Sequence, residues 1–242
     1  GQTISMAVGN NPTKIIGSEK FLPALQIMIE GYGKEDPPTR KMLPIETDIP
    51  QFLVDIGYGE SGNAHTRAIG DLSLIAFYYL LRIGEYTVKG KRNNKKQTVQ
   101  FKLEDVTFYK KTSVGQLWCL PKTAPYNLVL SADSATLKLD NQKNGWKGVC
   151  VHQETNGESV HCPIRALGRR VVHLRQHGAP SSSFLSTFFH RGERGDVLGE
   201  DISKARKMAA TLLEYPETWG IPIKLVDTHL LQCGVANPLA LL

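Results

Sequence analysis

Cysteine is scarce in this chain of 242 residues, which contains four. That is too few for a disulfide framework at this length, so we expect a reducing, intracellular setting, either nuclear or cytoplasmic. Long apolar runs are also missing. The longest, Leu72 to Leu81, covers ten residues and stops at Arg82, whereas a membrane-spanning helix needs about twenty. No charged region followed by an apolar one opens the sequence, so we expect neither a signal peptide nor a membrane partner.

Clusters of potential metal ligands are equally sparse. Cys150 and His152 lie near His161 and Cys162 in the sequence, and the four side chains could in principle bind zinc. The short separation between the two pairs does not match the spacing of common zinc modules. We therefore predict a strand, a turn at 155–157 and ordinary thiols here, with no bound metal.

The composition is that of a folded, globular protein. Hydrophobic residues make up 41% of the chain and charged residues 21%, which argues against wholesale disorder. A chain of this length accommodates one domain, or one domain with an appendage, and can bury a substantial core.

Positive charge is concentrated in one segment. The chain carries 29 Lys and Arg against 23 Asp and Glu, a net charge of +6 that mildly favours a polyanionic partner. Residues 82–147 alone hold 13 basic and 5 acidic side chains, a net charge of +8. This segment is either a set of solvated loops or a patch that binds the nucleic-acid backbone. Five of its cations crowd a loop rich in glycine and asparagine: Lys89, Lys91, Arg92, Lys95 and Lys96.

Apolar periodicity predicts helices on both sides of a small sheet. Asp71 is the expected N-cap of the most strongly patterned helix, which ends near Gly84. Other helices are expected at 18–31, 51–56, 163–177 and 201–213, with a last one beginning near Asp227. Alternating residues predict a strand at 98–109, two more short strands are expected at 134–139 and 149–152, and a further strand could form at 181–189. The predicted fold class is α+β, mostly helical, with a small three-stranded antiparallel sheet.

Three residues are candidates for chemistry because of their positions. Arg82 follows the apolar run, Lys143 lies in the Asn/Gly-rich turn at 140–145, and His229 stands at an expected helix start. Each also has an ordinary interpretation: an arginine whose stem packs on apolar surface, a solvated turn lysine and a structural histidine.

Taken in order, these motifs resemble the tyrosine recombinase (phage integrase-like) family, and most of all the integrases of DIRS-type retroelements. The resemblance is carried by Leu-Arg-Ile-Gly-Glu at 81–85, the turn Asp-Asn-Gln-Lys-Asn-Gly at 140–145 and His-Leu-Leu-Gln at 229–232. A linker-like stretch at 31–41, GYGKEDPPTRK, adds to it. The resemblance covers roughly residues 18–242.

The family implies double-stranded DNA as the partner, and strand cleavage and rejoining without a metal or other cofactor. Two arginines bind the non-bridging oxygens of the scissile phosphate, a lysine protonates the leaving oxygen, a histidine assists and a tyrosine attacks. The resemblance places Arg82, Lys143 and His229 in the catalytic set. We expect DNA contacts at Lys89, Lys91, Arg92, Lys95, Lys96, Lys147 and Gln232.

Two departures from the family pattern lead us to expect DNA binding without cleavage. Gln232 stands where the family has its second arginine, and all eight tyrosines precede His229. We expect an N-terminal arm, a remnant core-binding helix and a linker at 1–44, followed by a C-terminally incomplete catalytic-like domain at 45–242. Two alternatives stay open: a piece of an active integrase whose tyrosine lies beyond this chain or comes in trans, and a non-enzymatic interaction module. The sequence also leaves self-association on DNA open.

Overall fold

The computed structural model describes residues 46–88, 99–139, 148–220, 222–223 and 226. Their helices are α3 (Asp48–Tyr58), α4 (Ala64–Tyr78), α5 (Ile83–Tyr86), the 3-10 turn η1 (Leu103–Asp105), α6 (Tyr126–Leu130), α7 (Pro163–Gln176), α8 (Gly199–Leu212) and α9 (Tyr215–Trp219). Their strands are β1 (Val106–Lys111), β2 (Leu117–Cys119), β3 (Ser134–Leu139), β4 (Val149–Glu154), β5 (Thr187–His190) and β6 (Glu193–Asp196). The predicted α+β class is confirmed.

The main sheet has four antiparallel strands in the order β2-β1-β3-β4, rather than the predicted three. The added strand, β2, is exposed along its whole length and lies at the edge. Because β2 buries no apolar face, its short sequence does not alternate between apolar and polar side chains, and this signal for a strand is missing. Strands β3 and β4 form a continuous hairpin ladder from Ser134↔Glu154 to Leu139↔Val149. A separate hairpin pairs β5 with β6.

The first predicted strand, 98–109, is correct only from Val106 onward. Before it, Lys102 N–H donates to Asp105 Oδ2 at 2.8 Å, and this contact closes the turn η1. A short acidic side chain thus competes with strand formation by satisfying a nearby backbone donor.

The predicted start of the main helix at Asp71 is wrong. Helix α4 begins at Ala64, because the Asn63 side chain accepts hydrogen bonds from the backbone of His65 and Thr66, and Thr66 Oγ1 accepts one from Asn63 N–H. This reciprocal cap satisfies the first-turn donors better than a cap eight residues later. Asp71 lies in the middle of the helix and is 1% exposed.

Other predicted elements are found with shifted ends. Helix α7 begins at Pro163 as predicted, since proline suits the first helical position. Helix α3 is longer than the predicted 51–56, and α8 lies within two residues of its predicted bounds. The expected strand at 181–189 is confined to its last residues, in β5. The helix expected at 18–31, the turn at 140–145 and the helix expected near Asp227 lie outside the described residues.

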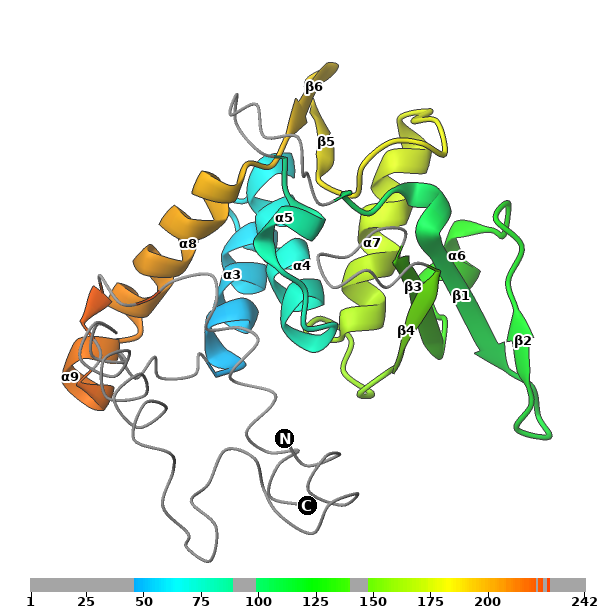
Figure 1. Cartoon of the computed structure of the whole chain (residues 1–242), viewed down its shortest axis with the longest axis horizontal. Coiled ribbons are helices and arrows are strands. Elements are labelled where there is room, and N and C mark those ends of the chain that lie inside the picture. The colour runs from blue at the N-terminus through cyan, green and yellow to red at the C-terminus, as the bar shows by residue number, and fades with distance from the viewer. Residues whose placement is uncertain (1–45, 89–98, 140–147, 221, 224–225, 227–242) are drawn as a thin grey trace, which may run out of the picture. The chain divides into compact units, whose positions relative to one another are not determined.

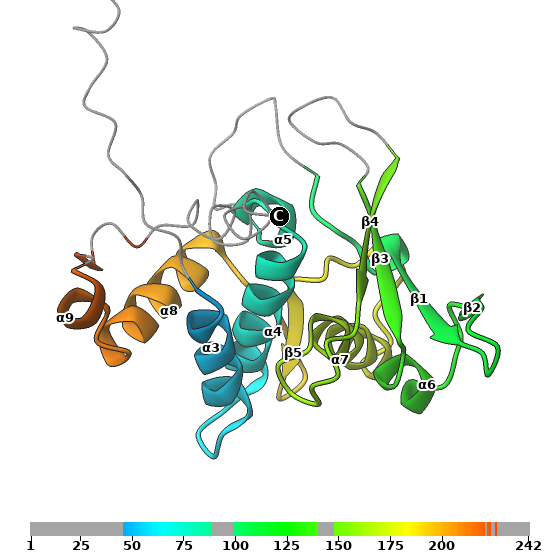
Figure 2. The same cartoon turned by 90° about the horizontal axis from the view of Figure 1, so that it is seen from below.

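Helix α7 lies between α4 and the main sheet, while α3 and α8 lie beyond α4 (Figures 1 and 2). The core is built from apolar side chains of α3, α4, α7 and β3, among which the most deeply buried include Ile49, Leu72, Leu74, Ile75, Leu137, Ile164 and Leu167. No helix in the described ranges is both long and apolar enough to cross a membrane.

Two glycines allow α3 and α4 to approach closely. A Cβ atom at Gly70 would lie 2.6 Å from Leu53 O and 2.8 Å from Val54 Cα. On the facing helix, a Cβ at Gly57 would lie 2.8 Å from Thr66 O. The obstacles are backbone atoms, which cannot move aside without separating the helices.

We therefore predict that Gly70→Ala lowers the free energy of unfolding by about 3 kcal/mol, because overpacking against backbone outweighs the gain in helix propensity. Chemical denaturation followed by circular dichroism measures the change. Gly199→Ala at the start of α8 is the matched control, since its Cβ would meet nothing closer than 3.4 Å. Equal stability of both variants would contradict this account of the helix crossing.

Candidate functional site

Arg82 occupies the corner between α4 and α5, and its backbone is held by Glu85. Arg82 N–H donates to Glu85 Oε2 at 2.7 Å, while Glu85 N–H donates to Arg82 O at 2.8 Å. The Glu85 side chain is buried, which raises the pKa of its carboxyl group. The partly buried Arg82 side chain forms no ion pair or hydrogen bond with a described residue. The corner thus fixes the backbone of an arginine whose guanidinium has no hydrogen bond or ion pair with a described residue, while its charge acts on the nearby Glu85 carboxyl group.

The described residues that flank the basic loop at 89–98 are anchored around α5. Val88 N–H donates to Val197 O at 3.0 Å, and Phe101 N–H donates to Glu85 O at 2.9 Å. Tyr86 adds a link to α8, because its hydroxyl accepts a hydrogen bond from Arg206 Nη2 at 2.6 Å. Both flanks of the basic loop therefore lie next to the Arg82 corner.

The hairpin β3–β4 brackets the segment that contains Lys143. Gly148 N–H donates to Leu139 O at 2.8 Å, which closes the described end of the ladder. This end of the hairpin and α5 lie toward the same side of the described body (Figure 2). Of the predicted site residues, Arg82 is described, and the others lie outside the described residues: Lys143, His229, Lys89, Lys91, Arg92, Lys95, Lys96, Lys147 and Gln232.

Much of the positive charge of residues 102–138 is neutralised locally. Lys102 pairs with Glu104 at 3.3 Å, Lys110 with Asp133 at 3.2 Å, and Lys111 with Glu154 at 3.0 Å. The two short segments 89–98 and 140–147 together carry seven cations and one acid, or +6 of the +8 found in residues 82–147. The excess charge therefore belongs to two segments whose described flanks lie on the side of the Arg82 corner.

Three of the four side chains considered as zinc ligands have separate partners, and the fourth, Cys150, is an exposed free cysteine. His161 Nε2 lies 2.7 Å from Asp55 Oδ1, and His152 Nδ1 lies 3.1 Å from Thr136 Oγ1. Cys162 is buried against Thr155. Within the described ranges, no group of three or more His, Cys, Asp or Glu side chains is arranged to hold a metal ion.

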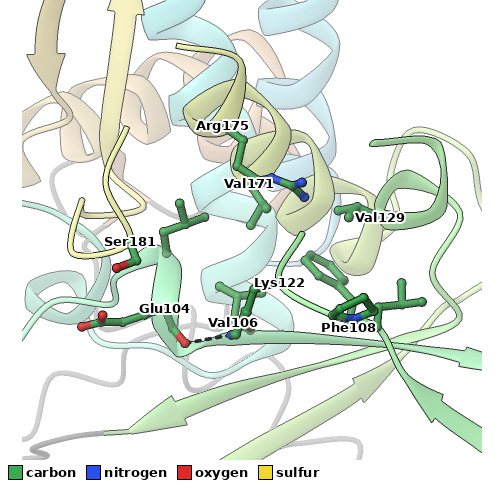
Figure 3. Close-up of a pocket in the computed structure, with 11 residues that line it drawn as sticks. Glu104, Val106, Phe108, Lys122, Val129, Val171, Arg175 and Ser181 are labelled. Carbon is green, nitrogen blue, oxygen red and sulfur yellow. Dashed lines mark hydrogen bonds between the residues drawn. The ribbon is translucent and has the colours of Figure 1, made fainter. Parts of the chain in front are cut away.

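A small apolar pocket of about 170 Å³ lies between β1 and α7 (Figure 3). Lys122 lies at its edge, and its Nζ donates to the carbonyl of Glu104 at 2.8 Å and to that of Val106. Burial lowers the pKa of Lys122. Arg175 on the α7 side lies over the ring of Tyr126, 5.1 Å from its centroid. The two hydrogen bonds of Lys122 give it a structural role, because they connect the loop after β2 to the start of β1.

A buried ion pair missed by the sequence analysis joins α4 to α7. Arg169 donates to Asp71 Oδ1 through Nε at 2.9 Å and Nη2 at 2.7 Å, and Tyr58 OH donates to Asp71 Oδ2 at 2.8 Å. Burial raises the pKa of Asp71, and Arg169 counteracts this rise. Burial lowers the pKa of Arg169, but Asp71 more than offsets this and raises it overall.

Next to this pair lies a groove of about 500 Å³, which we call the cationic groove. It is formed by the α3–α4 connection, α7 and β5, at the end of α4 farthest from Arg82 (Figure 2). Arg169, His173 and His177 follow one stripe of α7 at four-residue spacing, a pattern visible in the sequence. The charged and aromatic residues that line it are Tyr58, Arg67, Asp71, Arg169, Arg170, His173, His177, Phe189 and His190.

His173 is held neutral in this groove. Its Nε2 accepts a hydrogen bond from Phe189 N–H at 3.0 Å, so the proton of the neutral ring is on Nδ1. Burial and the positive charge of Arg170 lower the pKa of His173 from 6.5 to about 4.

We predict that His173 makes the protein less stable in mild acid. Between pH 6.5 and about 4 the unfolded chain binds a proton at His173 that the folded chain does not, so the free energy of unfolding falls as pH falls through this window. In His173→Gln this loss should be smaller by on the order of 2 kcal/mol, after a discount for solvent screening. Urea denaturation at pH 7.5 and pH 4.5 measures it. An unchanged pH dependence in the variant would contradict the assignment.

Comparison with known proteins adds no relative, because no protein-family model, curated protein or solved structure matches this chain.

Proposed function

We propose that this chain is a DNA-binding domain of the tyrosine recombinase (integrase) type, in which Arg82 binds a phosphate of double-stranded DNA. The observation that carries the proposal is the Arg82 corner: a rigidly held backbone, a guanidinium without a partner among the described residues, and two strongly basic segments whose described flanks lie on the same side. Unpaired cations at a duplex surface are what backbone recognition requires.

The chemistry of the proposed site follows from its residue types. A guanidinium presents several donors in a fixed plane and can bind two non-bridging phosphate oxygens at once. Lys143 would donate a proton to a leaving oxygen, and His229 would assist proton transfer. Gln232, where a second arginine would complete the grip, is neutral and offers weaker hydrogen bonds. We therefore propose DNA binding with impaired or absent strand cleavage.

We predict salt-sensitive binding to duplex DNA that depends on the basic loop. If Lys91 neutralises one phosphate, Lys91→Ala should flatten the slope of log affinity against log salt by about 0.9. The combined change of Lys91, Arg92, Lys95 and Lys96 to alanine should weaken binding to all sequences alike. Fluorescence anisotropy with a labelled duplex of about 25 base pairs, several turns of helix, measures both effects.

Lys111→Ala is the matched control for this experiment. It removes the same charge, but Lys111 lies on β1 and pairs with Glu154, so the slope should stay close to that of the parent chain. Lack of any salt-sensitive binding by the parent chain at low ionic strength would overturn the proposed function.

The neutral side chain of Gln232, at the position of the second arginine, leads to a second prediction. Gln232→Arg should strengthen duplex binding by about tenfold, because a hydrogen bond to a charged group contributes on the order of 1.5–3 kcal/mol. Arg82→Lys, which keeps the charge but loses the planar donor pair, should weaken binding. Circular dichroism would verify that both variants fold. If Arg82→Lys and Gln232→Arg both leave affinity unchanged, neither position contacts the phosphate backbone.

A further inference from the structure

The cationic groove lies far from the Arg82 corner on the same helix. Asn63 and Arg67 belong to the start of α4, whereas Arg82 follows its end. Fifteen helical residues span roughly 22 Å, and the groove lining reaches from the start of α4 to Asp71, so about half of the helix or more separates the two sites. A ligand in the groove would therefore not occupy the surface proposed for DNA.

The guanidinium groups that line the groove outnumber its carboxylates. Arg67, Arg169 and Arg170 line it, and Asp71 is the one acidic side chain among its described lining residues. The buried contact between Asp71 and Arg169 uses that carboxylate. Asp71 also interacts electrostatically with Arg170, so the described lining carries three guanidinium charges against one carboxylate, an excess of two positive charges.

Backbone contacts hold the guanidinium groups of Arg67 and Arg170 in place. Arg170 is 2% exposed, and it donates through Nε to Leu185 O at 3.1 Å and through Nη2 to Thr187 O. Neutral carbonyls satisfy its donors without cancelling its charge. The exposed Arg67 side chain donates from Nε to Gly57 O at 3.3 Å and lies 5.5 Å from the ring centroid of Tyr58. A partly buried, positively charged surface of this kind binds anions more strongly than dispersed surface cations do.

A hydrogen bond and ring stacking also hold the aromatic side chains of the groove in place. His177 donates from Nδ1 to His173 O at 2.9 Å, and its ring stacks on Phe189 with centroids 4.8 Å apart and planes at 4°. The His177 ring therefore directs its other nitrogen, Nε2, away from this backbone contact. The Asn63 side chain already caps the first turn of α4, so the cations rather than the helix end favour an anion.

From this surplus charge we infer that the cationic groove binds a small phosphomonoester. A phosphate monoester carries close to two negative charges at neutral pH, which matches the excess of two positive charges in the described lining. Its three terminal oxygens can accept hydrogen bonds from several donors at once. The open groove of about 500 Å³ leaves room for the organic part of such a ligand beside His177 and Phe189. This inference is independent of the proposed DNA binding.

Histidine NMR provides a site-specific test with inorganic phosphate as the probe. The full chain would be titrated at pH 7.5, with sodium chloride holding the ionic strength constant. Saturable shifts are expected for the ring signals of His177 and His190, which line the groove. The ring of His152 on β4, outside the groove, should not respond. Absence of saturable shifts at the groove histidines would overturn the inference.

Variants make the test quantitative. Arg67→Gln should weaken phosphate binding about tenfold, because it removes a charged donor, while Arg67→Lys should retain part of the affinity. Lys207→Gln on α8 removes one exposed cation outside the groove and should leave binding unchanged. Equal weakening by Arg67→Gln and Lys207→Gln would show that only net charge matters. It would contradict a specific phosphate site in the cationic groove.

A duplex without terminal phosphates separates this site from the proposed DNA surface. If the duplex binds and leaves His177 and His190 unshifted while phosphate shifts them, the groove is a separate site. Shifts of the same two histidines by the duplex would instead make the groove part of a DNA contact and overturn the phosphomonoester assignment.

Discussion

The buried ion pair between Asp71 and Arg169 is the contact on which both candidate sites depend. It fastens the middle of α4 to α7, and α4 in turn carries the cationic groove at its start and leads to Arg82 after its end. Arg169 donates two hydrogen bonds to one carboxylate oxygen of Asp71. Removal of either partner would leave an uncompensated charge in the core, at a cost of about 3–5 kcal/mol in stability. The geometry of the pair therefore constrains how α4 is oriented against α7, beyond what apolar packing would specify.

A second constraint comes from the other side of α4. The glycines at 57 and 70 bring α3 against α4 at backbone contact distance, so α4 is fixed by close packing on one face and by charge on another. Neither interaction alone determines a unique position: apolar packing tolerates sliding, and an ion pair tolerates rotation about its side chains. Together they fix the helix, and the reciprocal hydrogen bonds between Arg82 and Glu85 extend that rigidity to the corner beyond it.

Local signals in the sequence predicted those parts of the fold that depend on neighbouring residues. Pro163 marks the start of α7, and the strand predicted at 134–139 has the same bounds as β3. Predictions from the sequence were wrong where a polar side chain pairs with a residue far away along the chain. The sequence predicts Asp71 as a helix cap, and this prediction is wrong because its partner Arg169 is 98 residues away and leaves no local trace. The groove was missed for the same reason, since Arg67 and Arg170 come together only through the packing of α4 on α7.

The structure distinguishes cations that nearby acids neutralise from cations that keep their charge. A count of basic residues in the sequence cannot make this distinction. In the sheet region, lysines such as Lys110 and Lys111 pair with acids, so their contribution to the net charge is cancelled where they stand. Arg170 shows a second arrangement, in which carbonyl oxygens satisfy the donors and the charge persists. Arg82 shows a third, in which the backbone is fixed and the guanidinium lacks any partner among the described residues. A cation that nearby carboxylates do not fully neutralise retains its attraction for anions, so an anionic ligand would gain most by binding beside the last two arrangements.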